Sequence, residues 1–153
     1  MLAYLVQHGK AKSKDEDPDR PLTDEGRKEI EAVMLLMMQF GAITAARVVH
    51  SGRRRAEETA ELIAMKLEAG VDAVEGLGPD DNPVPWAERL RSGTQDLVLV
   101  GHLPHLERLA SLLLCGDPDA RVVRFVNGGI VCLSGQDGRW SVQWAVTPDL
   151  VQE

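Results

Sequence analysis

The 153-residue sequence has few cysteines and lacks any long apolar run. Its two cysteines, Cys115 and Cys132, form no C-x-x-C pair, which favours free, buried thiols in a reducing compartment over a disulfide or a metal site. No apolar stretch approaches the roughly 20 residues that span a bilayer. The apolar start at residues 2–6 is too short for a signal peptide and has no basic leader. We therefore expect a cytoplasmic protein that does not bind a membrane.

Positive charge is also scarce, because 17 Lys and Arg residues stand against 24 Asp and Glu residues, for a formal net charge of -7. This balance argues against a general nucleic-acid or anionic-membrane binder. The length and the 44% hydrophobic content suit one domain with its own core, and leave too little chain for two. We therefore expect a single domain over residues 1–153.

Several well-known catalytic motifs are missing from the sequence. There is no G-x-x-x-x-G-K-[ST] phosphate loop, no G-x-S-x-G elbow and no H-E-x-x-H zinc helix. His102 and His105 form a poor metal pair, since Pro104 lies between them and no carboxylate lies beside them. We therefore expect neither a metal nor a cofactor.

Apolar segments and helical patterns alternate along the first three quarters of the chain. Short apolar segments predict strands at residues 2–6, 46–51, 71–74 and 97–102. Amphipathic segments predict helices at residues 23–40, 53–70, 86–91 and 104–114. The remainder predicts antiparallel strands at residues 121–129, 130–135 and 139–146, joined by turns at 127–129 and 136–138. The sum is an α/β three-layer sandwich with a mainly parallel central sheet and antiparallel edge strands.

Polar residues follow three of the predicted parallel strands. His8 lies at the end of the first strand, Ser51 and Arg53 to Arg55 lie at the end of the second, and His102 ends the fourth. Ligands of such sheets bind at the carboxyl ends of the strands, so we expect these residues to converge. Histidine can act as a nucleophile, while arginine and a helix N-terminus bind anions. The pattern predicts a phosphoryl-transfer site that needs no metal.

Four motifs, in order, resemble those of the histidine phosphatase superfamily. "QHGKA" at residues 7–11 is similar to its RHG signature, and "RPLTDEGRKE" at 20–29 to its PLTxxGxxEA segment. "SGRRRAEETAELI" at 51–63 is similar to its SxxxRAxxTA block, and "LVLVGHLPHLERL" at 97–109 to its second-histidine strand. The short length without a cap insertion resembles the SixA-type phosphohistidine phosphatases. The resemblance implies their α/β/α fold without a large cap.

The resemblance also implies roles for the matched residues. His8 would take the phosphoryl group as a covalent phosphohistidine, Arg55 would bind phosphate oxygens, and His102 would stabilise the transferring group. Gln7 and Gly9 would complete the phosphate site. Arg53 and Arg54 match no catalytic position, and we expect them to pair with Glu57 and Glu58 on the helix surface. We expect His50 to pack near the site, and His105 to begin a helix or line the rim.

Gln7 departs from the family pattern, which has arginine at this position. Glutamine keeps a donor but loses the charge and the two-pronged fork. The loss would cost about ten-fold in rate, or roughly 10²–10³-fold if charge in the transition state depends on it. Lys10, Arg20 or Arg54 could restore the charge. Two interpretations follow: a working variant of the enzyme, or a catalytically impaired module that binds phosphorylated partners.

The substrate is predicted from what the site lacks. Cleaving a phosphate ester requires a general acid, and we find no clear one, since Glu75 and Asp80 fit an ordinary surface loop. Phosphohistidine leaves as imidazole and needs less acid. We therefore expect a monomer that acts on a phosphohistidine-bearing protein, such as a phosphotransfer domain or a phosphocarrier. The alternative within the family is a small-molecule phosphomonoesterase.

Overall fold

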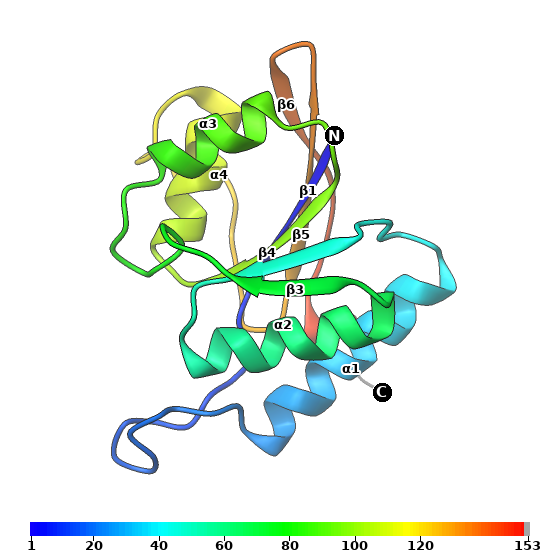
Figure 1. Cartoon of the computed structure of the whole chain (residues 1–153), viewed down its shortest axis with the longest axis vertical. Helices are drawn as coiled ribbons and strands as arrows, with labels where there is room; N and C mark the ends of the chain where they lie inside the picture. Colours follow the sequence, from blue (N-terminus) through cyan, green and yellow to red (C-terminus); the bar gives the residue numbers. More distant parts are fainter. Residues whose placement is uncertain (152–153) are drawn as a thin grey trace.

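The computed structural model describes residues 1–151, which form one mixed sheet covered by helices on both faces (Figure 1). The strands are β1 (Leu2–Gln7), β2 (Arg47–His50), β3 (Gly70–Ala73), β4 (Leu97–Gly101), β5 (Ile130–Gln136) and β6 (Arg139–Val146). The helices are α1 (Asp24–Gln39), α2 (Arg54–Leu67), α3 (Val84–Ser92), α4 (His105–Cys115) and the short 3-10 helix η1 (Pro148–Leu150). None of the helices in this part of the chain combines the length and apolar character needed to cross a bilayer.

The sheet has the strand order β3-β2-β4-β1-β5-β6. The first four of these strands are parallel to one another, whereas β5 is antiparallel to both β1 and β6. One apolar core lies between the sheet and α1 and α2, and a second lies between the sheet and α3 and α4. This arrangement confirms the predicted three-layer fold. Across residues 1–151, no connection adds a helical cap over the sheet.

Local sequence signals explain both helices of the first layer. Thr23 caps α1, because its Oγ1 accepts the Gly26 N–H at 3.0 Å. The small apolar face of α2 is buried against the sheet, and it consists of Ala56, Ala60, Ile63 and Ala64. Both cysteines are free thiols, and Cys132 is buried as expected. The expectation that Cys115 is buried is wrong, because this residue is exposed at the end of α4.

The strand predicted at residues 121–126 is wrong, because these residues form no strand. The strand that would pair with them, β5, already has β1 on one edge and β6 on the other, so no edge is left. The turn after them has a different use, since the Gly128 N–H donates to the Gln7 carbonyl at 2.9 Å. The second predicted turn is confirmed: Asp137 and Gly138 have φ of 52° and 76° and join β5 to β6.

Candidate active site

Two histidines and an arginine meet at the carboxyl ends of the parallel strands, as predicted. His8 follows β1 and His102 follows β4, and the His8 N–H donates to the Gly101 carbonyl at 3.1 Å. Their ring centroids lie 5.0 Å apart. Arg55 lies in the first turn of α2, and its Nε is 3.3 Å from His8 Nε2. The sheet therefore places the three side chains in one cluster.

Hydrogen bonds fix the tautomer of His8. Its Nδ1 lies 2.8 Å from the Gly9 carbonyl oxygen, which can only accept, so Nδ1 carries the proton. Nε2 is then unprotonated and accepts from Arg55 Nε. The unprotonated Nε2 carries the lone pair that a nucleophilic imidazole needs, and it lies beside Arg55.

Thr59 and Asn127 hold this arrangement, and the sequence analysis assigned a role to neither. Thr59 Oγ1 accepts the Gly9 N–H at 3.0 Å and donates to the Arg55 carbonyl at 2.8 Å, so it ties the two segments together. Asn127 Nδ2 donates to the His8 carbonyl at 3.0 Å. Thr59 lies inside the quoted motif at residues 51–63, which was a usable signal. Asn127 gave only a turn signal.

Gly9 lies where α1 packs closely against the end of β1. A Cβ on this residue would lie 2.6 Å from Ile30 Cδ1 and 3.3 Å from the Gly26 carbonyl oxygen, so a larger residue would require the Ile30 side chain to shift. Its N–H is occupied by Thr59 and its carbonyl by His8. The prediction that Gly9 binds phosphate stays a prediction, while the geometry shows that it orients His8.

His102 is held by Ser51, the residue that follows β2. Ser51 Oγ lies 2.6 Å from His102 Nε2, while His102 Nδ1 is buried without a hydrogen-bond partner in residues 1–151. His50 is buried nearby as predicted, and its Nδ1 accepts the Gly52 N–H at 3.0 Å. His105 begins α4, also as predicted, and is fully buried.

Burial keeps both site histidines neutral. Desolvation lowers the pKa of His8 to about 4; the Gly9 carbonyl opposes this shift, and the charges of Arg55 and Arg20 add to it. Desolvation also lowers the pKa of His102 to about 3, helped by His8, Arg55 and Arg53. Both imidazoles are therefore uncharged near pH 7. The positive charge of the site comes from its arginines.

The cations near the site differ in whether they form an ion pair with an acidic residue. Arg54 Nε lies 3.6 Å from Glu58 Oε2, as predicted. The predicted Arg53–Glu57 pair is absent from the described residues; Arg53 instead lowers the pKa of both Arg55 and His102. Lys10 Nζ is 2.8 Å from Glu25 Oε1 and therefore does not supply the charge that Gln7 lacks. The prediction for Arg53 was wrong because a fixed i,i+4 spacing does not decide which way a side chain turns.

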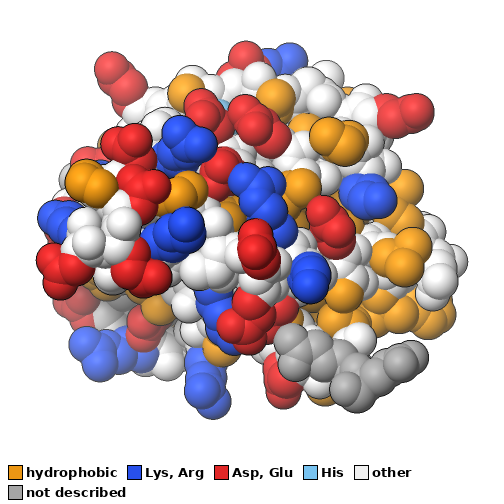
Figure 2. All heavy atoms as spheres, turned by 90° about the horizontal axis from the view of Figure 1, so that it is seen from below, with side chains coloured by type: hydrophobic (Ala, Val, Ile, Leu, Met, Phe, Trp, Pro, Cys, Tyr) orange, Lys and Arg blue, Asp and Glu red, His pale blue; other side chains and the backbone are white. Residues whose placement is uncertain are grey.

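Two open hollows are lined by residues that contact the histidines, one by Arg55 and the other by Ser51. The first, the basic hollow, has a volume of about 460 Å³ and is lined mainly by Lys14, Asp19, Arg20, Arg53, Arg54 and Arg55. The second, the Glu75 hollow, has a volume of about 630 Å³ and is lined in part by Ser51, Arg53, Val74, Glu75 and Asp81. Glu75 therefore reaches the site region, whereas Asp80 is not part of that lining. Figure 2 shows one face of the molecule with Lys and Arg interspersed with Asp and Glu, so the cations form no broad basic surface there.

The fold and the cluster together define an α/β protein that brings two neutral histidines and an arginine together at the carboxyl ends of its parallel strands. A model of the histidine phosphatase superfamily (branch 1) matches residues 3–78, which include His8 and Arg55. The chain belongs to the histidine phosphatase superfamily. In residues 1–151, no group of three or more His, Cys, Asp or Glu is placed to hold a metal ion.

Solved structures share this fold over nearly the whole chain. The protein histidine phosphatase SixA complexed with tungstate matches with a TM-score of 0.84 and 23% identity, covering 99% of this chain and 100% of that one. An Agrobacterium tumefaciens protein described as SixA has a TM-score of 0.77 and 20% identity, covering 96% of this chain and 97% of that one. The alpha-ribazole phosphatase from Shigella flexneri has a TM-score of 0.71 and 15% identity, covering 94% and 95%. A search of curated protein sequences found no match.

Proposed function

We propose that this chain is a phosphatase that removes the phosphoryl group from phosphohistidine on a partner protein. The observation that carries the proposal is the neutral His8, whose unprotonated Nε2 faces Arg55 and whose Nδ1 is fixed by the Gly9 carbonyl. The SixA structures share the fold, and one of them holds tungstate, a tetrahedral oxyanion like phosphate. A phosphohistidine phosphotransfer domain or phosphocarrier is the proposed partner.

The proposed reaction has two steps that balance. In the first, His8 Nε2 attacks phosphorus, the N–P bond of the substrate breaks, and the substrate imidazole leaves with the electron pair and takes up a proton. In the second, water attacks phosphorus, the N–P bond of phospho-His8 breaks, and inorganic phosphate leaves while a proton passes to solvent. Arg55 binds the phosphoryl oxygens throughout, and His102, held by Ser51, contacts the transferring group.

The substrate class follows from the leaving group and the open site. Imidazole is a far better leaving group than an alkoxide, so the reaction needs little help from a general acid. The two open hollows, which are lined by Ser51 and Arg55, leave room for a bulky partner. Both features favour phosphohistidine on a protein.

One observation favours a second candidate, a small-molecule phosphomonoesterase. Glu75 lines the same hollow as Ser51 and Arg53, so a carboxyl group lies near the site and would act as the general acid for an alkoxide. The alpha-ribazole phosphatase among the structural matches shows that this fold also occurs in a protein named for a small substrate.

The test is release of inorganic phosphate from a phosphohistidine-labelled carrier protein by wild type, His8→Ala and Gln7→Arg. We expect turnover by wild type, none by His8→Ala, and a gain of about ten-fold in Gln7→Arg from the added charge. His50→Gln is the matched control, because His50 makes its one side-chain hydrogen bond to Gly52 and glutamine can accept the same bond.

Each of the other possible results of this test would point to a different function or a different nucleophile. A silent wild type with an active Gln7→Arg would show that the natural chain only binds phosphorylated partners. Faster turnover of a sugar phosphate, whose leaving group is an alkoxide, than of the phosphoprotein, lost in Glu75→Gln, would establish the phosphomonoesterase instead. Turnover that survives in His8→Ala would refute His8 as the nucleophile.

A further inference from the structure

The proposed phosphate site has no positive charge at position 7, because Gln7 is neutral. This residue ends β1 opposite Gly101, directly before His8, and its Oε1 is buried without a hydrogen-bond partner in residues 1–151. A neutral amide does not balance the negative charge of a phosphoryl group. A cation that balances it must come from elsewhere in the chain.

Two of the nearby cations are already neutralised. Lys10 Nζ is shared between Glu25, at 2.8 Å, and Glu29, at 3.4 Å. Arg54 lies beside Glu58, whose two oxygens also bind Arg27 and the Leu22 N–H. Moving Lys10 toward phosphate would break its ion pair with Glu25, and moving Arg54 would break its contact with Glu58. These residues are therefore poor replacements for an arginine at position 7.

Arg20 is held differently. The segment before α1 folds back on itself through an isolated bridge between Ala11 and Leu22 and a 2.9 Å bond from the Lys12 N–H to the Pro21 carbonyl. Arg20 lies on the returning side with φ of 50°, and its Nε donates to the Lys12 carbonyl at 3.0 Å. Non-glycine residues rarely adopt this backbone conformation, so the loop holds Arg20 in a defined place.

The free end of Arg20 has no acid to pair with. Nε uses one of the five N–H donors of the guanidinium, which leaves the four on the terminal nitrogens. Among residues 1–151, Arg20 forms no ion pair, and Asp19, which lines the same hollow, does not pair with it. The side chain is thus anchored at one edge and open at the other.

Arg20 also lies close to the reacting groups. It lines the basic hollow together with Arg55, and its charge lowers the pKa of both His8 and Arg55. Arg53 is the other unpaired arginine there, but it acts on His102 and Arg55 and not on His8. Like charges held together without a carboxylate repel one another, and a bound anion would relieve the repulsion.

We propose that Arg20 binds the phosphoryl group beside Arg55 and so replaces the arginine that this chain lacks at Gln7. The inference rests on the proposed function, which it deepens by naming a second cationic ligand. The terminal nitrogens of the Arg20 guanidinium would donate to two oxygens of the phosphoryl group, while Nε keeps its hydrogen bond to the Lys12 carbonyl.

The test measures binding of inorganic phosphate by calorimetry and, separately, phosphate release from the phosphohistidine-labelled carrier. The variants are Arg20→Gln, Arg53→Gln, Gln7→Arg and the double variant Gln7→Arg/Arg20→Gln. Lys12→Gln is the matched control, since it removes an exposed cation from the same loop and leaves the backbone carbonyl in place. Thermal unfolding checks that each variant is folded.

We expect Arg20→Gln to weaken phosphate binding by about ten-fold and Lys12→Gln by less than about two-fold. The double variant should recover most of the loss. That recovery separates charge from folding, because an arginine at position 7 would not repair a damaged loop. Phosphate binding that depends on Arg20 in a chain without turnover would leave this inference standing while the proposed function fails.

Three results would overturn the inference. One is an Arg20→Gln variant that binds phosphate as tightly as Lys12→Gln. Another is a folded Arg20→Gln variant whose loss Gln7→Arg does not recover. The third is a larger loss in Arg53→Gln that Gln7→Arg does recover, which would assign the replacement to Arg53.

Discussion

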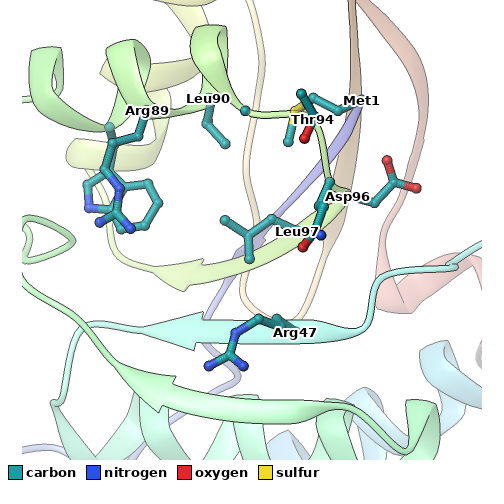
Figure 3. A pocket seen from close by; sticks show the side chains of 10 residues that line it. Met1, Arg47, Arg89, Leu90, Thr94, Asp96 and Leu97 are labelled. Atoms are coloured by element: carbon teal, nitrogen blue, oxygen red, sulfur yellow. The ribbon is translucent and has the colours of Figure 1, made fainter.

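Arginines lie at both ends of the parallel strands. Those that line the hollow at the amino end have partners, whereas three of those at the carboxyl end form no ion pair within residues 1–151. At the amino end, a hollow of about 280 Å³ is lined in part by Met1, Arg47, Trp86, Arg89, Asp96 and Leu97 (Figure 3). Arg47 forms an ion pair with Asp72, and the Arg89 guanidinium lies 4.0 Å from the centre of the Trp86 ring. At the carboxyl end, Arg20, Arg53 and Arg55 form no ion pair within residues 1–151.

Other polar groups differ in the same way. At the amino end, the Asp96 carboxylate accepts from the Leu2 N–H at 2.7 Å and from Thr44 Oγ1 at 3.0 Å. At the carboxyl end, Gln7 Oε1 and His102 Nδ1 are buried without partners in the described chain. Unsatisfied buried groups are costly, and proteins keep them where a ligand completes them. We therefore expect the amino-end hollow to be a structural feature and the carboxyl end to be the functional one.

The largest difference in kcat/KM is expected when one arginine at each end of the strands is replaced by glutamine. Arg55→Gln should lower kcat/KM for phosphoprotein by roughly 10²–10³-fold, because it removes a charge aimed at the phosphoryl group. Arg89→Gln should leave kcat/KM unchanged and cost about 0.5–1 kcal/mol of stability from the lost contact with Trp86. Steady-state phosphate release and urea unfolding measure the two quantities. Equal losses of activity at both ends would remove the distinction.

Acid should destabilise the carboxyl end through its neutral histidines. The pKa of His8 is about 4 in the folded chain, against 6.5 unfolded, so the unfolded chain binds more protons between these values. Stability is therefore complete above pH 6.5 and falls as the pH drops toward 4. By about pH 5, His8 alone should account for a loss of roughly 2 kcal/mol.

Urea unfolding of wild type and His8→Gln at pH 7 and about pH 5 measures this contribution. Acidification should cost His8→Gln roughly 2 kcal/mol less, since glutamine does not titrate. The carboxylates titrate in both proteins and cancel in the comparison. An equal acid loss in the two proteins would show that His8 is not held neutral by burial.

The sequence predicted the convergence because the topology alone requires it. Three parallel strands that each end in a polar residue place His8, Ser51 and His102 at one edge, whatever the loops do. The strand predicted at 121–126 failed because edge availability is a property of the whole sheet. Apolar alternation does not reveal that β1 and β6 already cover both edges of β5.

The fine structure of the site was less predictable for a related reason. Asn127 contacts the His8 carbonyl across 119 positions of sequence, and no local pattern encodes such a distance. Arg53 was assigned to Glu57 by spacing, although the structure turns it toward the site. Motifs predicted which residues form the site cluster, and only the packed chain shows which cations near that cluster form no ion pair within residues 1–151.

Two hydroxyl groups, one at each end of the strands, allow the same comparison with a smaller expected effect on kcat/KM. Ser51 Oγ holds His102 Nε2 at 2.6 Å, and Thr44 Oγ1 holds Asp96 at 3.0 Å at the other end. Ser51→Ala should lower kcat/KM about two- to ten-fold, as expected for one hydrogen bond of about 0.5–1.5 kcal/mol. Thr44→Ala should change stability by a similar free energy and leave kcat/KM unaltered. A Ser51→Ala variant with wild-type turnover would mean that His102 needs no support from Ser51.

The smallest effect is expected at the exposed pair of Arg47 and Asp72, whose side chains are 55% and 49% exposed. Arg47→Gln should cost about 1 kcal/mol or less, because water and salt screen an exposed ion pair. Unfolding in urea at low and high salt should show the difference shrinking as salt is added. Phosphate binding and turnover should match wild type, since Arg47 lies at the opposite ends of the strands from His8. Weaker phosphate binding in Arg47→Gln would show instead that the amino-end hollow is coupled to the site, and the two ends would no longer divide into structure and function.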